Sequence, residues 1–330
     1  MKRLLQIIGL LVVGLGLFVG VALLSGRQAP LDLVELAEKR HAVELESSLV
    51  AVNGVRLHVV QAGPKDGPPV VLLHGYPELW FAWSAQIAHL ARAGFRVIAP
   101  DQRGYNGSDK PAAVEAYAMP MLVQDIVELT QQLGHEQVYL AAHDWGGAVA
   151  WYLALEHPER FTKLVIFNAA HPLAWGDAKR ANPDEETVSW YRTFFQLPWV
   201  PELVGRLGNW RMLTGSLRSS SREGAFTDED LDAYRYAWDR DGSMHAMIQW
   251  YRAGFRDPYL PQGDGNVKVP TRIVWGMQDK FFAPSMAEFS LKHCADGSLR
   301  TLPDATHWLL HEEPQLTSDE MIEFFRAAPR

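Results

Sequence analysis

The segment Ala142-His143-Asp144-Trp145-Gly146-Gly147 has the spacing of a nucleophile elbow, a sharp turn between a buried strand and a helix. Small residues two positions before and after the central residue let the backbone turn tightly and expose the central side chain. That residue is Asp144, and the sequence contains no G-x-S-x-G motif, which disfavours a serine esterase. An aspartate at this place also fits an ordinary helix N-cap. The elbow alone therefore leaves a carboxylate nucleophile and a cap equally open.

The elbow lies within a regular alternation of short apolar runs and helical patterns. Two runs, 43–50 and 56–61, flank an Asn53-Gly54 pair that is typical of a hairpin turn. The next run, residues 69–74, is continuous and apolar, as in a strand buried on both faces. The further strand patterns are residues 95–101, 137–142, 163–167, 271–276 and 299–302. Helical patterns separate most of these runs, so the sequence predicts βαβ units, a mostly parallel sheet and the α/β class.

The alternation stops between residues 172 and 258. This stretch has no buried-strand pattern, yet it holds six of the twelve tryptophans. We interpret it as a helical cap inserted after the sixth strand of a core made of residues 43–171 and 259–330. The tryptophans fit either an apolar substrate pocket or the core of the cap itself.

From about residue 43 to the end, the chain resembles the epoxide hydrolase and haloalkane dehalogenase branch of the α/β-hydrolase superfamily. His74-Gly75-Tyr76-Pro77 is similar to the H-G-x-P oxyanion loop of that branch, and residues 101–111 are similar to its R-G-Y-G-x-S-x-x-P loop, with Asn106 where glycine is usual. The resemblance implies an eight-stranded α/β-hydrolase fold. It also implies that the backbone amides of Tyr76 and Trp145 form the oxyanion hole.

A nucleophile of this type needs an acid and a histidine from later strands, in that chain order. Asp279 follows the strand that ends at Gly276, and His307 follows the strand that ends at Leu302. Both lie where parallel strands end, which is where open α/β sheets keep their sites. His307 and His311 are also spaced i, i+4, but no H-E-x-x-H glutamate or third ligand accompanies them, and we expect no metal.

The proposed chemistry follows from a carboxylate nucleophile. Attack by Asp144 on an sp³ carbon gives an alkyl ester, which a water activated by His307 can hydrolyse, while Asp279 orients the histidine. By resemblance to epoxide hydrolase cap segments, Tyr191 and Tyr251 are the donors that help the epoxide oxygen leave. The expected reaction converts a small apolar or aromatic epoxide and water into a vicinal diol, without a cofactor.

Two other functions stay open at this point. A haloalkane dehalogenase would use the same two steps, although that function favours Asn where Tyr76 stands. An inactive binding protein on a hydrolase fold is the other alternative.

The first thirty residues predict a membrane anchor. Residues 4–24 carry no charge, and as a helix they would be about 31 Å long, the thickness of a hydrocarbon core. Lys2 and Arg3 precede them, which places the amino terminus in the cytoplasm and the catalytic domain on the extracytoplasmic face. A cleaved signal peptide would instead make the protein secreted or periplasmic.

Composition narrows the partners further. The net charge of −8 disfavours nucleic acid, and the single cysteine, Cys294, excludes an intramolecular disulfide. The sequence leaves the oligomeric state open.

Overall fold

The computed structural model describes residues 28–182, 187–261 and 263–328. Its centre is one eight-stranded sheet in the order β1-β2-β4-β3-β5-β6-β7-β8. The strands are β1 (Leu45–Val52), β2 (Val55–Ala62), β3 (Pro69–Leu73), β4 (Arg96–Pro100), β5 (Val138–His143), β6 (Phe161–Phe167), β7 (Thr271–Gly276) and β8 (Gly297–Leu302). Strand β2 runs antiparallel to both neighbours and every other pair is parallel. The predicted α/β-hydrolase fold is therefore confirmed.

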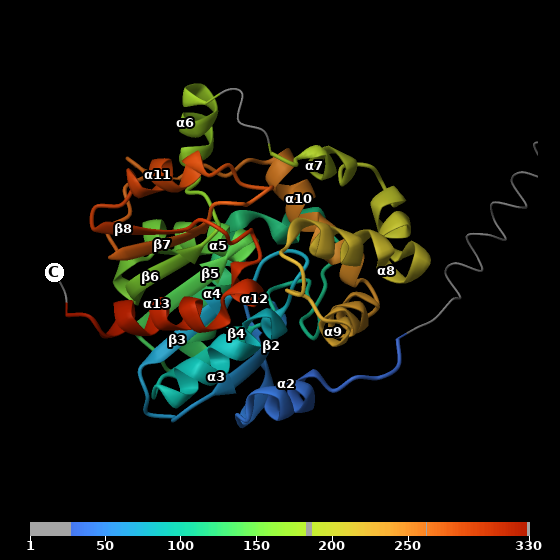
Figure 1. Cartoon of the computed structure of the whole chain (residues 1–330), viewed down its shortest axis with the longest axis horizontal. Coiled ribbons are helices and arrows are strands. Elements are labelled where there is room, and N and C mark those ends of the chain that lie inside the picture. Colours follow the sequence, from blue (N-terminus) through green and yellow to red (C-terminus); the bar gives the residue numbers. More distant parts are fainter. Residues whose placement is uncertain (1–27, 183–186, 262, 329–330) are drawn as a thin grey trace, which may run out of the picture.

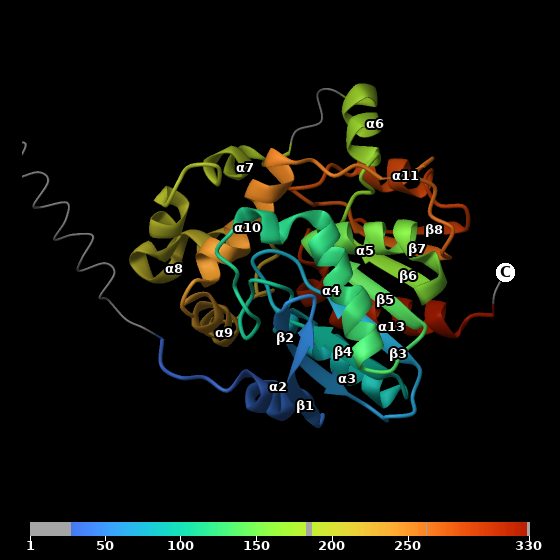
Figure 2. The ribbon, with the colours of Figure 1, turned by 180° about the vertical axis from the view of Figure 1, so that it is seen from behind.

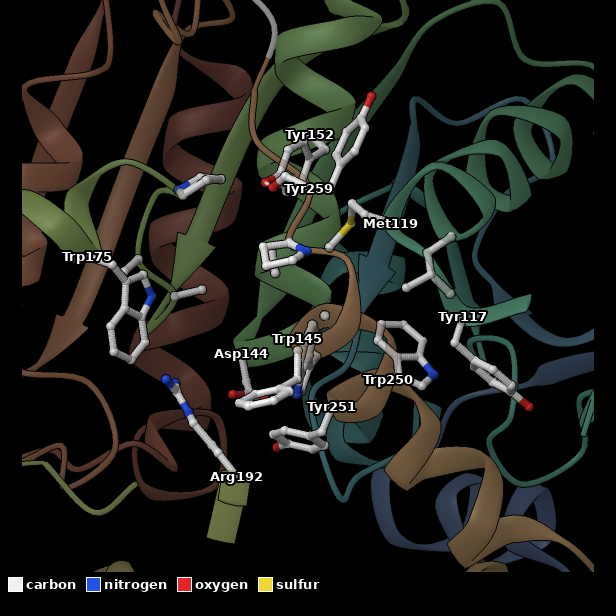
Figure 3. Close-up of a pocket in the computed structure, with 18 of the residues that line it drawn as sticks. Tyr117, Met119, Asp144, Trp145, Tyr152, Trp175, Arg192, Trp250, Tyr251 and Tyr259 are labelled. Atoms are coloured by element: carbon white, nitrogen blue, oxygen red, sulfur yellow. Dashed lines mark hydrogen bonds between the residues drawn. The ribbon is translucent and has the colours of Figure 1, made fainter. Parts of the chain in front are cut away.

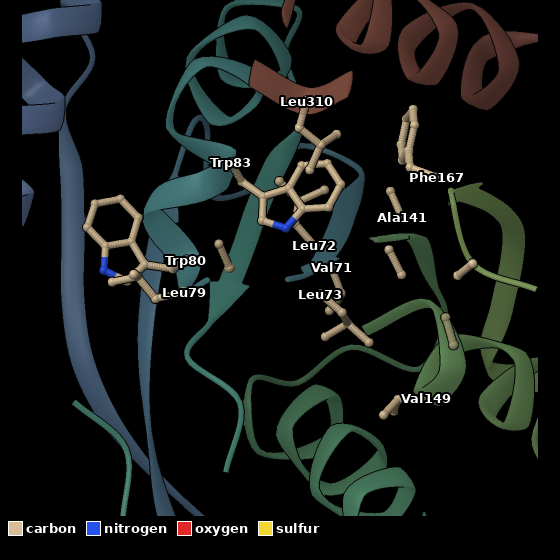
Figure 4. Close-up of a cluster of buried hydrophobic side chains, with 14 of the residues drawn as sticks. Val71, Leu72, Leu73, Leu79, Trp80, Trp83, Ala141, Val149, Phe167 and Leu310 are labelled. Carbon is tan, nitrogen blue, oxygen red and sulfur yellow. The ribbon is translucent and has the colours of Figure 1, made fainter. Parts of the chain in front are cut away.

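Helices cover both faces of the sheet. Helices α3 (Ser84–Arg92) and α13 (Pro314–Arg326) lie in front of it in Figure 1, and α4 (Met119–Gln132) and α5 (Asp144–Glu156) lie in front of it in Figure 2. Because both faces are covered, the central strands are apolar throughout. From Val70 to Leu73, every residue of β3 is fully buried. Figure 4 shows Val71, Leu72 and Leu73 among buried side chains from both sides of the sheet.

The hairpin has the turn that its sequence predicts. Asn53 and Gly54 both have positive φ, 41° and 76°, as a two-residue turn between twisted strands requires. Short elements complete the core: α2 (Leu33–His41), η1 (Trp80–Trp83), η2 (Val114–Tyr117), η3 (Pro158–Arg160), α11 (Ser285–Leu291) and α12 (Leu309–Glu312). Helix α2 was not predicted, although Asp32 caps it by accepting hydrogen bonds from the amides of Val34 and Glu35.

A helical insertion separates β6 from β7. Its helices are α6 (Ala174–Ala181), α7 (Trp190–Phe194), α8 (Val200–Ser220), α9 (Asp228–Trp238) and α10 (Ser243–Arg256). In both views, α7 to α10 gather at one side of the sheet. Its tryptophans have mixed environments, since Trp238 and Trp250 are buried while Trp199 is 76% exposed. The domain limits 43–171, 172–258 and 259–330 stay predictions.

The predicted membrane anchor needs correction. Among the described residues, no helix combines the length and apolar character needed to cross a bilayer. The longest described helix, α8, carries Glu202, Arg206, Arg211 and Arg218 along its 21 residues. The predicted anchor, residues 4–24, lies outside the described residues. The membrane-anchored state and the extracytoplasmic location are therefore withdrawn.

Candidate active site

The turn between β5 and α5 has the geometry of a nucleophile elbow. Asp144 has φ of 50°, a left-handed conformation that non-glycine residues rarely adopt. A Cβ atom at Gly146 would lie 2.4 Å from the carbonyl oxygen of Leu73, and one at Gly147 would lie 2.3 Å from Cβ of Ala169. The small residues of the motif are thus required by close packing against β3 and the segment after β6.

The two carboxylate oxygens of Asp144 have different surroundings. The Tyr76 amide donates a hydrogen bond of 2.8 Å to Oδ1. Oδ2 lies 3.7 Å from Nε2 of His307. Gly75 permits this approach, because a Cβ there would lie 2.5 Å from Cβ of Asp144. The geometry thus leaves Oδ2 as the oxygen that is free to attack.

The second predicted oxyanion donor is the amide of Trp145. Trp145 lies in the first turn of α5, where backbone amides have no acceptor within their own helix. Its role stays a prediction.

His307 and Asp279 form a buried pair, as the order of the strands predicts. Nδ1 of His307 lies 2.8 Å from Oδ2 of Asp279, and their side chains are 2% and 0% exposed. A carboxylate accepts, so Nδ1 carries the proton and the lone pair of Nε2 faces Asp144. Burial alone lowers the pKa of His307, but the Asp279 carboxylate and, more weakly, those of Asp144 and Glu78 outweigh it and raise this pKa.

Asp279 accepts hydrogen bonds from two further segments. The backbone amides of Phe281 and Phe282 donate to its Oδ1 at 2.7 and 3.0 Å. The side-chain amide of Asn168, which follows β6, donates to its Oδ2 at 2.6 Å. Sequence analysis missed Asn168. Its position directly after a buried strand was the signal that could have found it.

The insertion supplies two tyrosines to the same place. Tyr191 comes from α7 and Tyr251 from α10, and their ring centroids lie 5.7 Å apart. Tyr76 and Trp145 pack edge-on against Tyr251 at 5.0 and 5.1 Å. Burial raises the pKa of Tyr191 and, more strongly, that of Tyr251, so both hydroxyls stay protonated at neutral pH. Their role as donors stays a prediction.

Two cavities meet at these residues. Asp144, Tyr191 and Tyr251 line both a cavity of about 470 Å³ and one of about 520 Å³. Figure 3 shows the first, with Trp145, Trp250 and Tyr251 on one side of Asp144 and Trp175 on the other. The second includes His307, and its walls include Phe195, Leu213 and Leu217. Walls of this kind favour an apolar substrate body.

The α/β-hydrolase fold model matches residues 68–314. The chain belongs to this family. It is 40% identical to the AB hydrolase superfamily protein YfhM of Bacillus subtilis over 86% of this chain and 98% of the relative. It is 34% identical to the human protein named epoxide hydrolase 4, over 84% and 78% of the two chains. The crystal structure of an epoxide hydrolase from Bacillus megaterium in complex with an inhibitor superposes with a TM-score of 0.77 at 30% identity, covering 85% of this chain and all of that one.

These comparisons confirm the resemblance on which the sequence interpretation depends. They leave the roles of individual residues untested.

In the loop that resembles the hydrolase R-G-Y-G motif, Asn106 has φ of 33° and its side-chain amide donates to the Asp101 carboxylate at 2.8 Å. The asparagine thus supports the turn that glycine usually makes.

The i, i+4 pair His307 and His311 has carboxylate partners on different sides. Nε2 of His311 lies 2.6 Å from Oε1 of Glu78. Among the described residues, no group of three or more His, Cys, Asp or Glu side chains is arranged to bind a metal ion.

Glu78 belongs to a buried cluster that sequence analysis missed. Its Oε1 also accepts from the Tyr234 hydroxyl at 2.9 Å, and its Oε2 lies 3.2 Å from Nδ1 of His143. Nε2 of His143 donates to the backbone oxygen of His307 at 2.8 Å. Glu78 follows the Tyr76 loop and His143 precedes Asp144, so a polar residue beside each motif was the available signal. We call Glu78, His143, Tyr234 and His311 the rear cluster.

Proposed function

We infer that this α/β-hydrolase is an epoxide hydrolase, which adds water to an epoxide and releases a vicinal diol. Relatives and structural neighbours with that name support the assignment. The observation that carries it is the placement of Tyr191 and Tyr251 around the cavities that Asp144 lines. An epoxide oxygen leaves as an alkoxide and needs a strong hydrogen-bond donor, which a phenol supplies, whereas a halide needs only weak donors.

In the first step, Oδ2 of Asp144 attacks one carbon of the epoxide ring. The bond between that carbon and the ring oxygen breaks, and the oxygen takes a proton from Tyr191 or Tyr251. The product of this step is an alkyl ester on Asp144 with a hydroxyl group on the neighbouring carbon. Oδ1, already bonded to the Tyr76 amide, becomes the carbonyl oxygen of the ester.

In the second step, Nε2 of His307 takes a proton from a water molecule, which attacks the ester carbonyl of Asp144. Negative charge develops on Oδ1, where the Tyr76 amide and the proposed Trp145 amide stabilise it. Asp279 stabilises the imidazolium that forms. The ester bond then breaks, the leaving alkoxide takes the proton of the His307 imidazolium, and the Asp144 carboxylic acid that water has formed returns a proton to the tyrosinate. These steps use only side chains, backbone amides and water.

Trapping the ester tests this proposal. In His307→Gln, Asp144 can still attack but no base activates the water, so intact-protein mass spectrometry should detect an adduct after incubation with an aryl epoxide. An epoxide adds its whole mass because ring opening loses no atoms, while a haloalkane adds only its alkyl group. Asp144→Ala in the same background should abolish the adduct. An adduct formed only from haloalkanes would show the dehalogenase function instead, and one that persists without Asp144 would refute the nucleophile.

The tyrosines test the choice of leaving group. Tyr191→Phe and Tyr251→Phe should each slow ester formation by about 10²-fold or more, because the leaving oxygen loses a donor, and the double variant should be nearly inactive. Stopped-flow fluorescence of ester formation measures this rate. If the double variant formed the ester at the wild-type rate, the epoxide assignment would lose its main support.

A further inference from the structure

Two charged side chains that the proposed reaction does not use line the cavity of about 470 Å³: they are Arg192 and, at the end of α10, Asp257. Arg192 follows Tyr191 on α7 and lines this cavity together with Asp144 and Trp175. Figure 3 shows Arg192 reaching from α7 toward Trp175, with Asp144 beside it. Most of the other lining side chains are aromatic or aliphatic, so a cation here is out of place unless it binds something.

The guanidinium of Arg192 is held by an aromatic face rather than by a carboxylate. Its central carbon lies 4.2 Å from the centre of the Trp175 ring. Within residues 28–182, 187–261 and 263–328, no carboxylate forms an ion pair with it, whereas other arginines of the insertion do pair: Arg206 with Asp239, Arg222 with Glu313, and Arg252 with Glu202.

Stacking on an indole uses the face of the guanidinium, so its N–H groups lie at the edge, where the Tyr191 side chain is one hydrogen-bond partner. Five N–H groups in a planar fork match the two oxygens of a carboxylate. A single guanidinium balances one negative charge, so a carboxylate fits this place better than a phosphate dianion.

We propose that Arg192 binds a carboxylate on the substrate, so that the enzyme acts on epoxides with an apolar or aromatic body and one acidic arm in the cavity of Trp175. This inference rests on the proposed epoxide hydrolase function. It adds the class of epoxide and names Arg192 as the residue that selects it.

Another role for Arg192 must be separated from this one. Its guanidinium is close enough to Tyr191 to oppose the rise in the pKa of that hydroxyl that burial causes. If Arg192 acted only through Tyr191, its loss would slow charged and neutral epoxides equally. Selection of a carboxylate would slow only the charged ones.

The test compares aryl epoxides that end in a carboxylate with their isosteric carboxamides, over a series of spacer lengths. Wild type should prefer the acid at one or more spacer lengths. In Arg192→Gln the ratio of kcat/KM for acid over amide should fall by on the order of 10- to 100-fold. Arg192→Lys, which keeps the charge but not the fork, should give an intermediate ratio.

Arg256→Gln is the matched control. Arg256 is at the end of α10, next to the cavity-lining residue Asp257, and its side chain is 63% exposed. Removing its charge tests general attraction of anions and should change the ratio by less than about twofold. An equal loss for acid and amide in Arg192→Gln, an equal effect of Arg256→Gln, or no preference for acids in wild type would each overturn the proposal.

A binding measurement keeps this proposal separate from the proposed function. Isothermal titration with an arylalkanoic acid and its amide, neither carrying an epoxide, needs no turnover. Wild type should bind the acid more tightly, and Arg192→Gln should lose that difference. If no epoxide were hydrolysed but this difference remained, the function would fail and the carboxylate site would stand. If epoxides were hydrolysed but the acid bound no better than the amide, the carboxylate site would fail.

Discussion

Two histidines with carboxylate partners lie side by side in this molecule, and their surroundings differ in one respect. The rings of His143 and His307 are 4.6 Å apart, and each ring has Nδ1 near a buried carboxylate, that of Glu78 or Asp279. Nε2 of His307 faces Asp144. Nε2 of His143 donates to the backbone oxygen of His307. In the pair of His307 and Asp279, the second ring nitrogen thus faces the nucleophile. In the pair of His143 and Glu78, the second ring nitrogen is bonded to the backbone.

This difference assigns different roles to the two rings. Both nitrogens of His143 have protein partners, the Glu78 carboxylate and the backbone oxygen of His307, so neither nitrogen faces the reacting atoms. Burial raises the pKa of Glu78, but the hydrogen bonds from His143 and His311 outweigh it and lower the pKa far below its usual range. His307 keeps one lone pair and can accept a proton. The two histidines therefore differ in their access to the cavity, not in residue type, and only His307 is placed to act as a base.

Replacing each histidine by glutamine should show the largest difference. His307→Gln should slow ester hydrolysis by about 10³-fold, the usual contribution of a positioned general base. His143→Gln should unfold at lower temperature while its folded fraction hydrolyses the ester within about tenfold of wild type, because no proton of the reaction passes through it. Single-turnover kinetics and thermal melts measure the two properties. Equal kinetic losses would show that the rear cluster takes part in catalysis.

Replacing the two carboxylates, Asp279 and Glu78, should give the next largest difference. Asp279→Asn should slow ester hydrolysis by about 10²-fold or more per folded enzyme, since His307 loses the group that fixes its tautomer and stabilises its charge. Glu78→Gln removes the buried carboxylate that His143, Tyr234 and His311 face, and we expect a loss of about 3 kcal/mol in the free energy of unfolding. Urea denaturation checks the second expectation. A Glu78→Gln variant as stable as wild type would contradict the charge assignment in the rear cluster.

The same comparison explains what the sequence could predict. Asp144, Asp279 and His307 follow the ends of β5, β7 and β8 by one, three and five residues, so a correct strand assignment places them together at one edge of the sheet. Tyr191 and Tyr251 were found only because their segments resemble known cap segments. The local sequence pattern around each tyrosine was enough to locate it. Contacts between distant segments give no such local pattern.

The rear cluster could not be predicted in this way. Its four residues come from the loop after β3, from β5, from α9 in the insertion and from α12, and no spacing in the sequence links them. The insertion must first be placed on the core before Tyr234 meets Glu78. The membrane prediction had a different weakness, since it used the apolar composition of residues 4–24 alone.

The pH dependence of ester hydrolysis should further distinguish the influence of Asp279 on His307 from that of Glu78. In the proposed reaction neutral His307 is the base. Asp279 contributes to raising its pKa, so the rate of ester hydrolysis should fall on acidification at a pH above the ordinary histidine value of about 6.5. In Asp279→Asn burial prevails and the fall should move to lower pH. Glu78→Gln should move it in the same direction but less, because Glu78 is the weakest of the named influences. Rates from pH 5 to 9 measure the shift, and a larger shift in Glu78→Gln than in Asp279→Asn would reverse the roles of the two carboxylates.

The free energy of unfolding should also depend on pH through the protonation of His307. A raised folded-state pKa means that the His307–Asp279 pair stabilises the fold fully below the unfolded value, and that this contribution is lost as pH rises through the folded value. The stability difference between wild type and Asp279→Asn should therefore be larger at pH 5.5 than at pH 9, as measured by urea denaturation.

The smallest expected effect on stability comes from removing one hydroxyl from each region. The Tyr234 hydroxyl donates to Glu78, and its loss in Tyr234→Phe removes one of the donors on that carboxylate while Nδ1 of His143 and Nε2 of His311 still face it. The expected loss is about 1 kcal/mol in the free energy of unfolding, with ester formation at the wild-type rate. Tyr191→Phe makes the same chemical change beside the cavity, where the hydroxyl has a reacting oxygen as its partner, so it should slow ester formation with little effect on unfolding. Urea denaturation and stopped-flow measurements on both variants give a two-by-two comparison. A kinetic loss in Tyr234→Phe comparable to that in Tyr191→Phe would mean that the rear cluster reaches the reacting atoms, and that access to the cavity does not divide the two regions.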